Sequence, residues 1–164
     1  MSADEKGKCR SCKVDLVDWK RVHKRTLRDV AYTFDALKLE MVRHHNWHVD
    51  FDKKALRSAE TKGRDSLIKF AETRINKYLA PATNAYDGRQ TPFEGNVVYY
   101  AQHATATCCR TCLEYWHGIP KGRPLSEEEQ NFCVRLIDLY LNRRLPELPE
   151  VPEESVLARL VKKR

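Results

Sequence analysis

Residues 99–125, YYAQHATATCCRTCLEYWHGIPKGRPL, gather more chemically demanding side chains than any other stretch of the chain. Three of the six cysteines fall here, together with two of the six histidines. A basic turn rich in glycine and proline, Gly118–Arg123, completes the stretch. Thiols and imidazoles spaced this closely are typical of zinc ligands. We therefore expect the fold to be organised around a zinc-bearing centre in this stretch.

The chain carries no sign of export or membrane insertion. Residues 1–6 are polar and acidic, unlike the basic and then apolar start of a signal peptide. The longest uninterrupted apolar run, residues 97–101, is far shorter than a membrane-spanning helix requires. We therefore expect a cytoplasmic protein with no membrane partner. In that compartment, thiols at CxxC spacing are more often metal ligands than disulfides.

Length and composition favour a domain with a substantial hydrophobic core. The chain has 164 residues, of which 41% are hydrophobic and 32% are charged. We expect a cysteine-containing lead over residues 1–17, a helical zinc-binding domain over residues 18–148, and a proline-containing spacer with a basic tail over residues 149–164. The formal net charge of +7 favours an anionic partner but falls well short of a histone-like charge.

Three stretches carry apolar side chains at spacings of three and four, which is the period of an amphipathic helix. They predict helices over residues 18–43, 52–79 and 127–145. Asp18 is positioned to cap the first helix, and Gly63 is a weak point in the second. Ser126 and Glu129 form a capping box at the start of the third.

The remaining segments are shorter. Residues 81–95 contain Asp-Gly and Thr-Pro turn formers and predict a loop. Residues 97–100, Val-Val-Tyr-Tyr, are the best strand candidate, and residues 109–117 predict a short helix that Gly118 ends. The predicted fold is mainly α, with three substantial helices around a small zinc-bearing centre and minor β structure.

Two CxxC pairs, Cys9 with Cys12 and Cys109 with Cys112, are the first candidates for zinc ligands. Zinc in structural sites takes four ligands in a tetrahedron, so the two pairs complete a site if the fold brings them together. Cys108 is a possible replacement for Cys109, because adjacent cysteines do not easily point the same way.

A local site is the alternative. Cys109-x2-Cys112-x4-His117 matches the first three ligands of a CCHC zinc knuckle, but the fourth ligand position holds Gly122. His103 or the N-terminal pair would then have to complete the coordination. The full set of candidate ligands is Cys9, Cys12, Cys108, Cys109, Cys112, His103 and His117.

Two further groups are interpreted as structural. His44 and His48 share a helix face at i,i+4, which is a known metal-ligand spacing. We favour instead a histidine-rich helix end with Trp47 in the core. Cys133 lies on the apolar side of the last predicted helix, and we interpret it as a core residue.

Enzymatic interpretations find less support in the sequence. A zinc deaminase needs a His-x-Glu motif, and no histidine here is followed two residues later by glutamate. A metal-dependent nuclease or other hydrolase is an alternative, with His103 or His117 activating water. A structural module for protein interaction is a further alternative.

Basic side chains gather at two places that suit a nucleic-acid partner. The early turns of the first predicted helix carry Lys20, Arg21, Lys24, Arg25 and Arg28. Positive charge there opposes the helix dipole, so it does not serve helix stability. In the second place, Lys121 and Arg123 stand in a rigid turn near Trp116, which suits phosphate contact with base stacking. A solvated helix face and a basic connector are the alternative explanations. We expect a zinc-stabilised intracellular protein that binds nucleic acid.

Residues 78–125 resemble a small uncharacterised domain family of prokaryotes and phages, a domain of unknown function. The resemblance rests on YLAPA, DGRQTPF and the signature HATATCCR-x-CL-x-x-WH-x-IPKGR. That family has no established activity, so the resemblance implies a compact site and adds no reaction. Its signature implies functional or metal-site roles for His103, Cys108, Cys109, Cys112, Trp116, His117, Lys121, Gly122 and Arg123.

Overall fold

The computed structural model describes residues 6–9, 11–83 and 87–150 of the chain. This part is mainly helical, as predicted, and contains no β-strand. Its α-helices are α1 (Trp19–Val22), α2 (Val30–Leu37), α3 (Met41–His48), α4 (Lys53–Arg74), α5 (Val97–Ala104), α6 (Arg110–His117) and α7 (Glu127–Arg144). A 3-10 turn, η2 (Leu27–Asp29), precedes α2, and a π-helical turn, η3 (Ile75–Leu79), extends α4. None of the helices in these ranges is long and apolar enough to cross a lipid bilayer.

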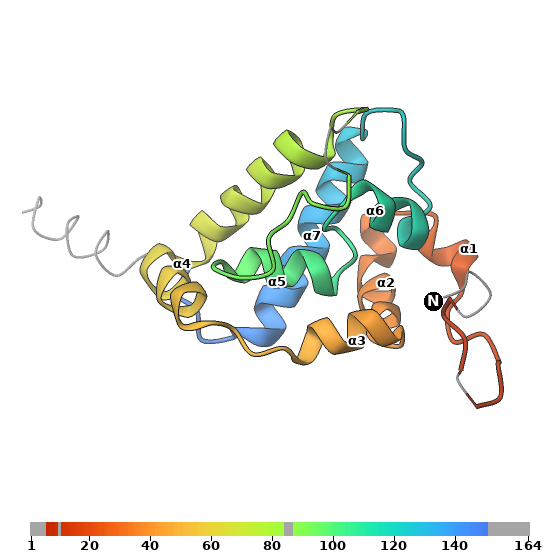
Figure 1. Ribbon diagram of the computed structural model, residues 1–164, viewed down its shortest axis with the longest axis horizontal. Helices are drawn as coiled ribbons and strands as arrows, with labels where there is room; N and C mark the ends of the chain where they lie inside the picture. Colours follow the sequence, from red (N-terminus) through yellow and green to blue (C-terminus); the bar gives the residue numbers. More distant parts are fainter. Residues whose placement is uncertain (1–5, 10, 84–86, 151–164) are drawn as a thin grey trace, which may run out of the picture.

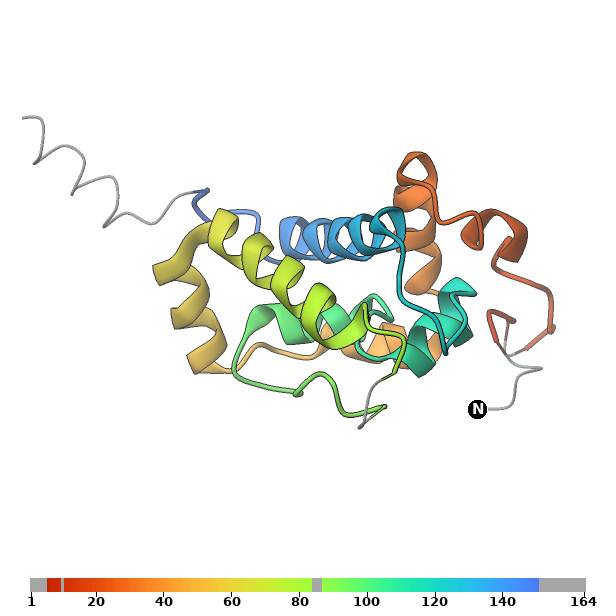
Figure 2. The same cartoon turned by 90° about the horizontal axis from the view of Figure 1, so that it is seen from above.

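Helix α7 forms the centre of the molecule. The predicted capping box is present: Ser126 Oγ accepts from the Glu129 N–H at 3.2 Å, and the Glu129 carboxylate accepts from the Ser126 N–H at 3.0 Å. The helix packs against α2, α4 and α5. Figures 1 and 2 show it running through the middle, with α4 on one side and α2 on the other. Its fully buried side chains include Phe132, Leu136 and Tyr140.

The single helix predicted over residues 18–43 is wrong, because the chain there folds into α1, η2, α2 and the start of α3. Asp18 does cap α1, accepting from the Arg21 N–H at 3.1 Å. Arg25 then adopts a φ of 54°, a left-handed conformation that a right-handed helix cannot contain.

Two internal caps restart the helices after that break. Thr26 Oγ1 accepts from the Asp29 N–H at 3.3 Å at the start of η2. The Glu40 carboxylate accepts from the N–H groups of Val42 and Arg43, both at 3.0 Å, at the start of α3. Each cap satisfies amides that a new helix leaves without partners, so short helices form where a single long one was expected.

The helix predicted over residues 52–79 is confirmed as α4 followed by η3. Gly63 is its break, with φ 70° and ψ 170°, and Figure 2 shows the bend between the two halves. The break frees the N–H groups of Arg64 and Asp65, which donate to the carbonyl oxygens of Pro149 at 2.8 Å and Glu150 at 3.1 Å. The start of the predicted spacer therefore packs on α4, whereas residues 151–164 lie outside the described residues.

The strand predicted over residues 97–100 is wrong, because these residues form the first half of α5. Asn96 caps the helix, its Oδ1 accepting from the Val98 N–H at 2.9 Å. Val97, Val98 and Tyr100 are all buried. A short run with no polar position has no period, so a buried strand and a buried helix look alike in the sequence.

The described part of the lead, residues 6–9 and 11–17, forms a small hairpin. An isolated antiparallel bridge joins Lys8 and Asp15, and the Cys9 N–H donates to the Val14 carbonyl oxygen at 2.9 Å. Gly7, at φ 65°, packs so closely on the Trp19 ring that an added Cβ would lie 2.5 Å from it. The hairpin is therefore fixed to α1.

Gly118 ends α6 as predicted, and its substitution tests the packing there. The residue has a φ of 64°, and an added Cβ would lie 3.1 Å from the His23 ring. We expect Gly118→Ala to lower the free energy of unfolding by about 2 kcal/mol, because the left-handed conformation alone costs an L-residue about 1–2 kcal/mol and His23 must also move. Urea unfolding followed by circular dichroism measures the change. Gly122→Ala is the matched control, since Gly122 also has positive φ but open space around it. Equal losses in both variants would contradict the contribution of His23.

Candidate metal centre

A tight buried turn between α5 and α6 delivers three thiols to one place. Thr107 donates its N–H to the Gln102 carbonyl oxygen at 2.9 Å, and Gln102 Nε2 donates back to the Thr107 carbonyl oxygen at 2.9 Å. Ala106, between them, has a φ of 56°. This closed turn fixes the direction in which Cys108 and Cys109 leave α5.

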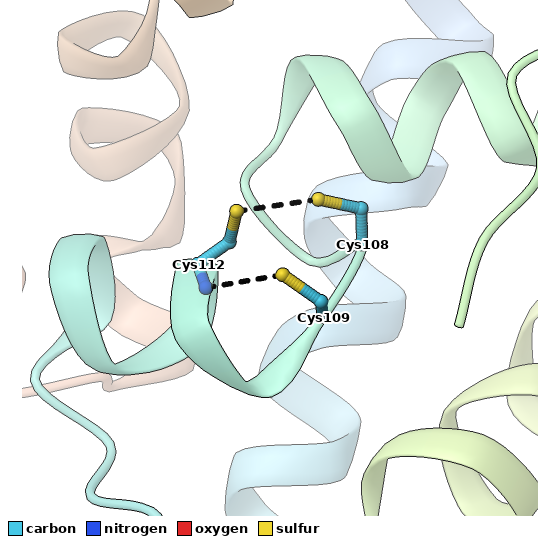
Figure 3. Close-up of side chains that lie close together, drawn as sticks. All are labelled: Cys108, Cys109 and Cys112. Carbon is cyan, nitrogen blue, oxygen red and sulfur yellow. Dashed lines mark hydrogen bonds between the residues drawn. The ribbon is translucent and has the colours of Figure 1, made fainter. Parts of the chain in front are cut away.

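Cys108, Cys109 and Cys112 point toward one another, as Figure 3 shows. Their sulfur atoms all lie within 4.8 Å of one another, and the Cys108 and Cys112 sulfurs are 3.4 Å apart. Cys109 caps α6, its sulfur accepting from the Cys112 N–H at 3.3 Å. The first two side chains are buried and the third is partly exposed.

The protonation of each of the three thiols depends on the other two. The pKa of Cys108 is raised well above its ordinary value by hydrogen bonds to Cys109 and Cys112 and by burial. The pKa of Cys112 is lowered, because its sulfur accepts from Cys108 and Cys109 and lies beside the Arg43 guanidinium. Negative charge is therefore held at Cys112.

Arg43, on α3, is the counter-ion of this group and was missed in the sequence analysis. Its Nη2 donates to the Cys112 sulfur at 3.6 Å, and its Nη1 donates to the His103 carbonyl oxygen. Glu40 lies 3.5 Å from Nε. Burial opposes the charged form, but the sulfurs and Glu40 together hold the pKa of Arg43 above its ordinary value. The sequence did contain one signal for this role: Arg43 is a charged residue one turn before Trp47, on the buried face of the helix.

The two histidines of the signature lie outside the thiol group. His103 stacks on Phe93 with ring centroids 4.3 Å apart, its Nε2 lies 3.1 Å from the Pro92 carbonyl oxygen, and it lines a pocket of about 390 Å³ with Asp52. His117 is fully buried, with Nε2 3.0 Å from the Thr105 carbonyl oxygen, and burial lowers its pKa to about 4. His117 therefore supports the turn that carries the thiols, and solvent water does not reach it.

The structure does not bring Cys9 and Cys12 into this group. Both belong to the N-terminal hairpin, which rests on α1, and the four-cysteine set is not assembled in the described residues. Cys133 is fully buried in the core as predicted, and burial raises its pKa to about 12.

The predicted nucleic-acid surface is only partly available. Base stacking on Trp116 is wrong for this fold, because that ring is 0% exposed in the core. Lys121 lies 2.7 Å from Asp87, and Arg123 binds both carboxylate oxygens of Glu129, at 2.6 and 2.8 Å. These two cations are therefore already paired within the fold.

Of the five cations in the first predicted helix, two bind other groups of the described fold and three form no ion pair there. Arg25 donates to the carbonyl oxygens of His117 and Gly118, and Arg21 pairs with Asp29 at 2.7 Å. Lys20, Lys24 and Arg28 are exposed and form no ion pair with any described residue.

Arg43→Met tests the electrostatics of the thiol group. The variant keeps most of the aliphatic stem and removes the cation, so we expect the pKa of Cys112 to rise. In metal-free protein, alkylation of Cys112 by iodoacetamide should then move to higher pH, because the thiolate is the nucleophile. Peptide mass mapping from about pH 3, near the wild-type pKa of Cys112, up to about pH 9 measures this shift. Arg21→Met is the surface control, and identical profiles for wild type and Arg43→Met would contradict the assignment.

The same lowered pKa has a consequence for stability. Because the folded pKa of Cys112 lies below its unfolded value, the stabilisation is complete above about pH 8.5 and is lost as the pH falls toward the folded pKa. Arg43→Met should make this pH dependence shallower in metal-free protein, as urea unfolding at a series of pH values would show.

No solved structure matches the chain. A family model described as Domain of unknown function (DUF4186) matches residues 31–142, from the first turn of α2 to the last turn of α7. The matched range contains the three clustered cysteines and Arg43, and it excludes Cys9 and Cys12. Because the match covers more than half of its length, the chain belongs to the family of that domain of unknown function.

Proposed function

We propose that this protein binds a thiophilic metal ion, foremost zinc, through Cys108, Cys109 and Cys112. The observation that carries the proposal is the convergence of three sulfurs within 4.8 Å. Around a tetrahedral zinc ion, Zn–S bonds of about 2.3 Å place two sulfurs about 3.8 Å apart. The separation of 3.4 Å between Cys108 and Cys112 is close to that value, so small side-chain movements suffice.

Charge balance supports the same proposal. Three thiolates around a divalent cation carry a net charge of −1, which is unfavourable in a buried site without a counter-ion. Arg43 supplies a positive charge in contact with Cys112, and it shares this charge with Glu40. Thiolates favour zinc, copper(I) and iron–sulfur clusters over magnesium or calcium. Three protein ligands also leave a fourth position for water, a small ligand or another side chain.

Metal analysis of the full chain, purified without chelator, tests this function. We expect Cys112→Ser to lose one equivalent of zinc relative to wild type and to unfold at lower temperature, because metal binding is linked to folding. Cys133→Ala is the matched control, since it removes a buried thiol away from the site and should leave the metal content unchanged. An unchanged zinc content in Cys112→Ser would contradict the proposal.

Contact with nucleic acid is a second proposal, limited to a smaller surface than the sequence indicated. It rests on Lys20, Lys24 and Arg28, whose charges are exposed and without ion pairs in the described part of the chain. Cations of this kind bind phosphates and release counterions, which makes the affinity depend steeply on salt.

Replacing Lys20, Lys24 and Arg28 by glutamine together tests the second proposal. We expect weaker binding of a labelled oligonucleotide in fluorescence anisotropy, and a salt slope smaller by up to about three, one for each lost phosphate contact. The triple glutamine variant of Lys53, Lys54 and Arg57 removes the same charge from another exposed surface. Equal affinity of the two triple variants would rule out a specific surface.

A further inference from the structure

The N-terminal hairpin, residues 38–40 and the start of α3 line a pocket of about 450 Å³, and none of the three clustered cysteines lines it. Cys9 lines it from the hairpin, and His44 lines it from α3. Large apolar side chains stand exposed in the same walls, with Leu16 39%, Leu39 52% and Met41 46% exposed. Exposed apolar side chains gathered around one hollow indicate a surface that is covered in another state of the protein.

The hairpin arranges its cysteines as a metal-binding turn does. Lys13, directly after Cys12, has a φ of 61°, and its N–H donates to the Cys9 carbonyl oxygen at 3.0 Å. The backbone amides of Cys12 and Ser11 donate to the Cys9 sulfur. Such amide donors stabilise a thiolate while leaving lone pairs for a metal.

On the opposite wall, His44 of α3 lines the pocket, and His48 follows one turn further along the same helix. His44 and His48 are exposed, one turn apart, with ring centroids 4.3 Å apart. Nδ1 of His48 lies 2.8 Å from the His44 carbonyl oxygen. A proton donated from Nδ1 to that oxygen leaves the Nε2 lone pair of His48 available, which is the usual arrangement of a metal-ligating histidine.

We propose that Cys9, Cys12, His44 and His48 form a second metal site, of the Cys2His2 class and suited to zinc, distinct from the central thiol group. The spacings Cys-x2-Cys and His-x3-His fall within those of structural zinc sites. Two thiolates and two neutral imidazoles balance the charge of Zn²⁺, so the site needs no counter-ion such as Arg43. It would fasten the lead to α3.

Without metal, the central site is closer to a metal-binding geometry than the N-terminal site. Within the described residues, the central three cysteines are the only group of three or more potential ligands whose ligand atoms all lie within 4.8 Å of one another, so the N-terminal four do not yet form a closed set. Zinc would draw the hairpin toward α3 and narrow the pocket, covering Leu16, Leu39 and Met41. The energy of that apolar burial adds to the energy of metal coordination.

Zinc content of the full-length double variant His44→Gln/His48→Gln tests the proposal. We expect about two zinc ions per chain in wild type, one from each site, and one fewer in the double variant. His45→Gln is the matched control, because His45 is an exposed neighbour on α3 that lines the other pocket. Both imidazoles are exposed, so circular dichroism should show an unchanged fold in these variants.

Limited trypsin digestion supplies a second readout. Zinc should slow cleavage after Lys8 and Lys13 in wild type and in His45→Gln, because the closed hairpin is less accessible. The same protection should be absent in His44→Gln/His48→Gln and in Cys9→Ser/Cys12→Ser.

The outcomes separate this site from the central one. Both sites are supported if each double variant, His44→Gln/His48→Gln and Cys9→Ser/Cys12→Ser, loses one zinc ion. In that case the other zinc ion should be lost only in Cys112→Ser. Loss in the double variants with full retention in Cys112→Ser supports this site and removes the central one. Zinc retained in His44→Gln/His48→Gln overturns the proposal. The proposal is also overturned if Cys9→Ser/Cys12→Ser and Cys112→Ser lose the same single zinc ion, because that result would establish a shared four-cysteine site.

Discussion

The buried guanidinium of Arg43 is the interaction on which the centre of this structure depends. It joins α3 to the end of α5 through the His103 carbonyl oxygen and to α6 through the Cys112 sulfur. Burying a charge is costly unless its partners are placed well, so these partners constrain where three helices lie. Removing the cation would leave an anionic thiol group and Glu40 without compensation. The same contact that positions the helices therefore determines the charge of the candidate metal centre.

The sequence predicted helices well where their ends were marked and poorly where breaks lay inside a regular pattern. The capping box at Ser126 and the weak point at Gly63 are both present in the structure. The apolar spacing over residues 18–43 continued across the left-handed Arg25 and the cap at Glu40, because spacing reports burial and does not report backbone conformation. Val97, Val98 and Tyr100 are buried and Tyr99 is half-buried, so the run has no exposed position and lacks the alternation that distinguishes strands from helices.

Only those features of the candidate site that depend on residues close together in the sequence could be predicted. The three central thiols lie within five positions, so their convergence follows from one turn and one helix start. The roles of Lys121 and Arg123 depend on Asp87 and Glu129, and the position of Trp116 depends on packing against Trp19. Contacts between distant segments have no local signature. For this reason the sequence did not reveal that both cations of this turn are paired with carboxylates of the same chain.

The break at Gly63 also affects the order in which the chain can complete its structure. A helix start normally satisfies its first amides from residues close by, but Arg64 and Asp65 obtain acceptors from Pro149 and Glu150, beyond the end of α7. Closing so long a loop carries an entropy penalty that must be met before the contact forms. These two hydrogen bonds at the start of the second half of α4 therefore form only when the chain after α7 reaches α4, which links the middle of the sequence to its C-terminal region.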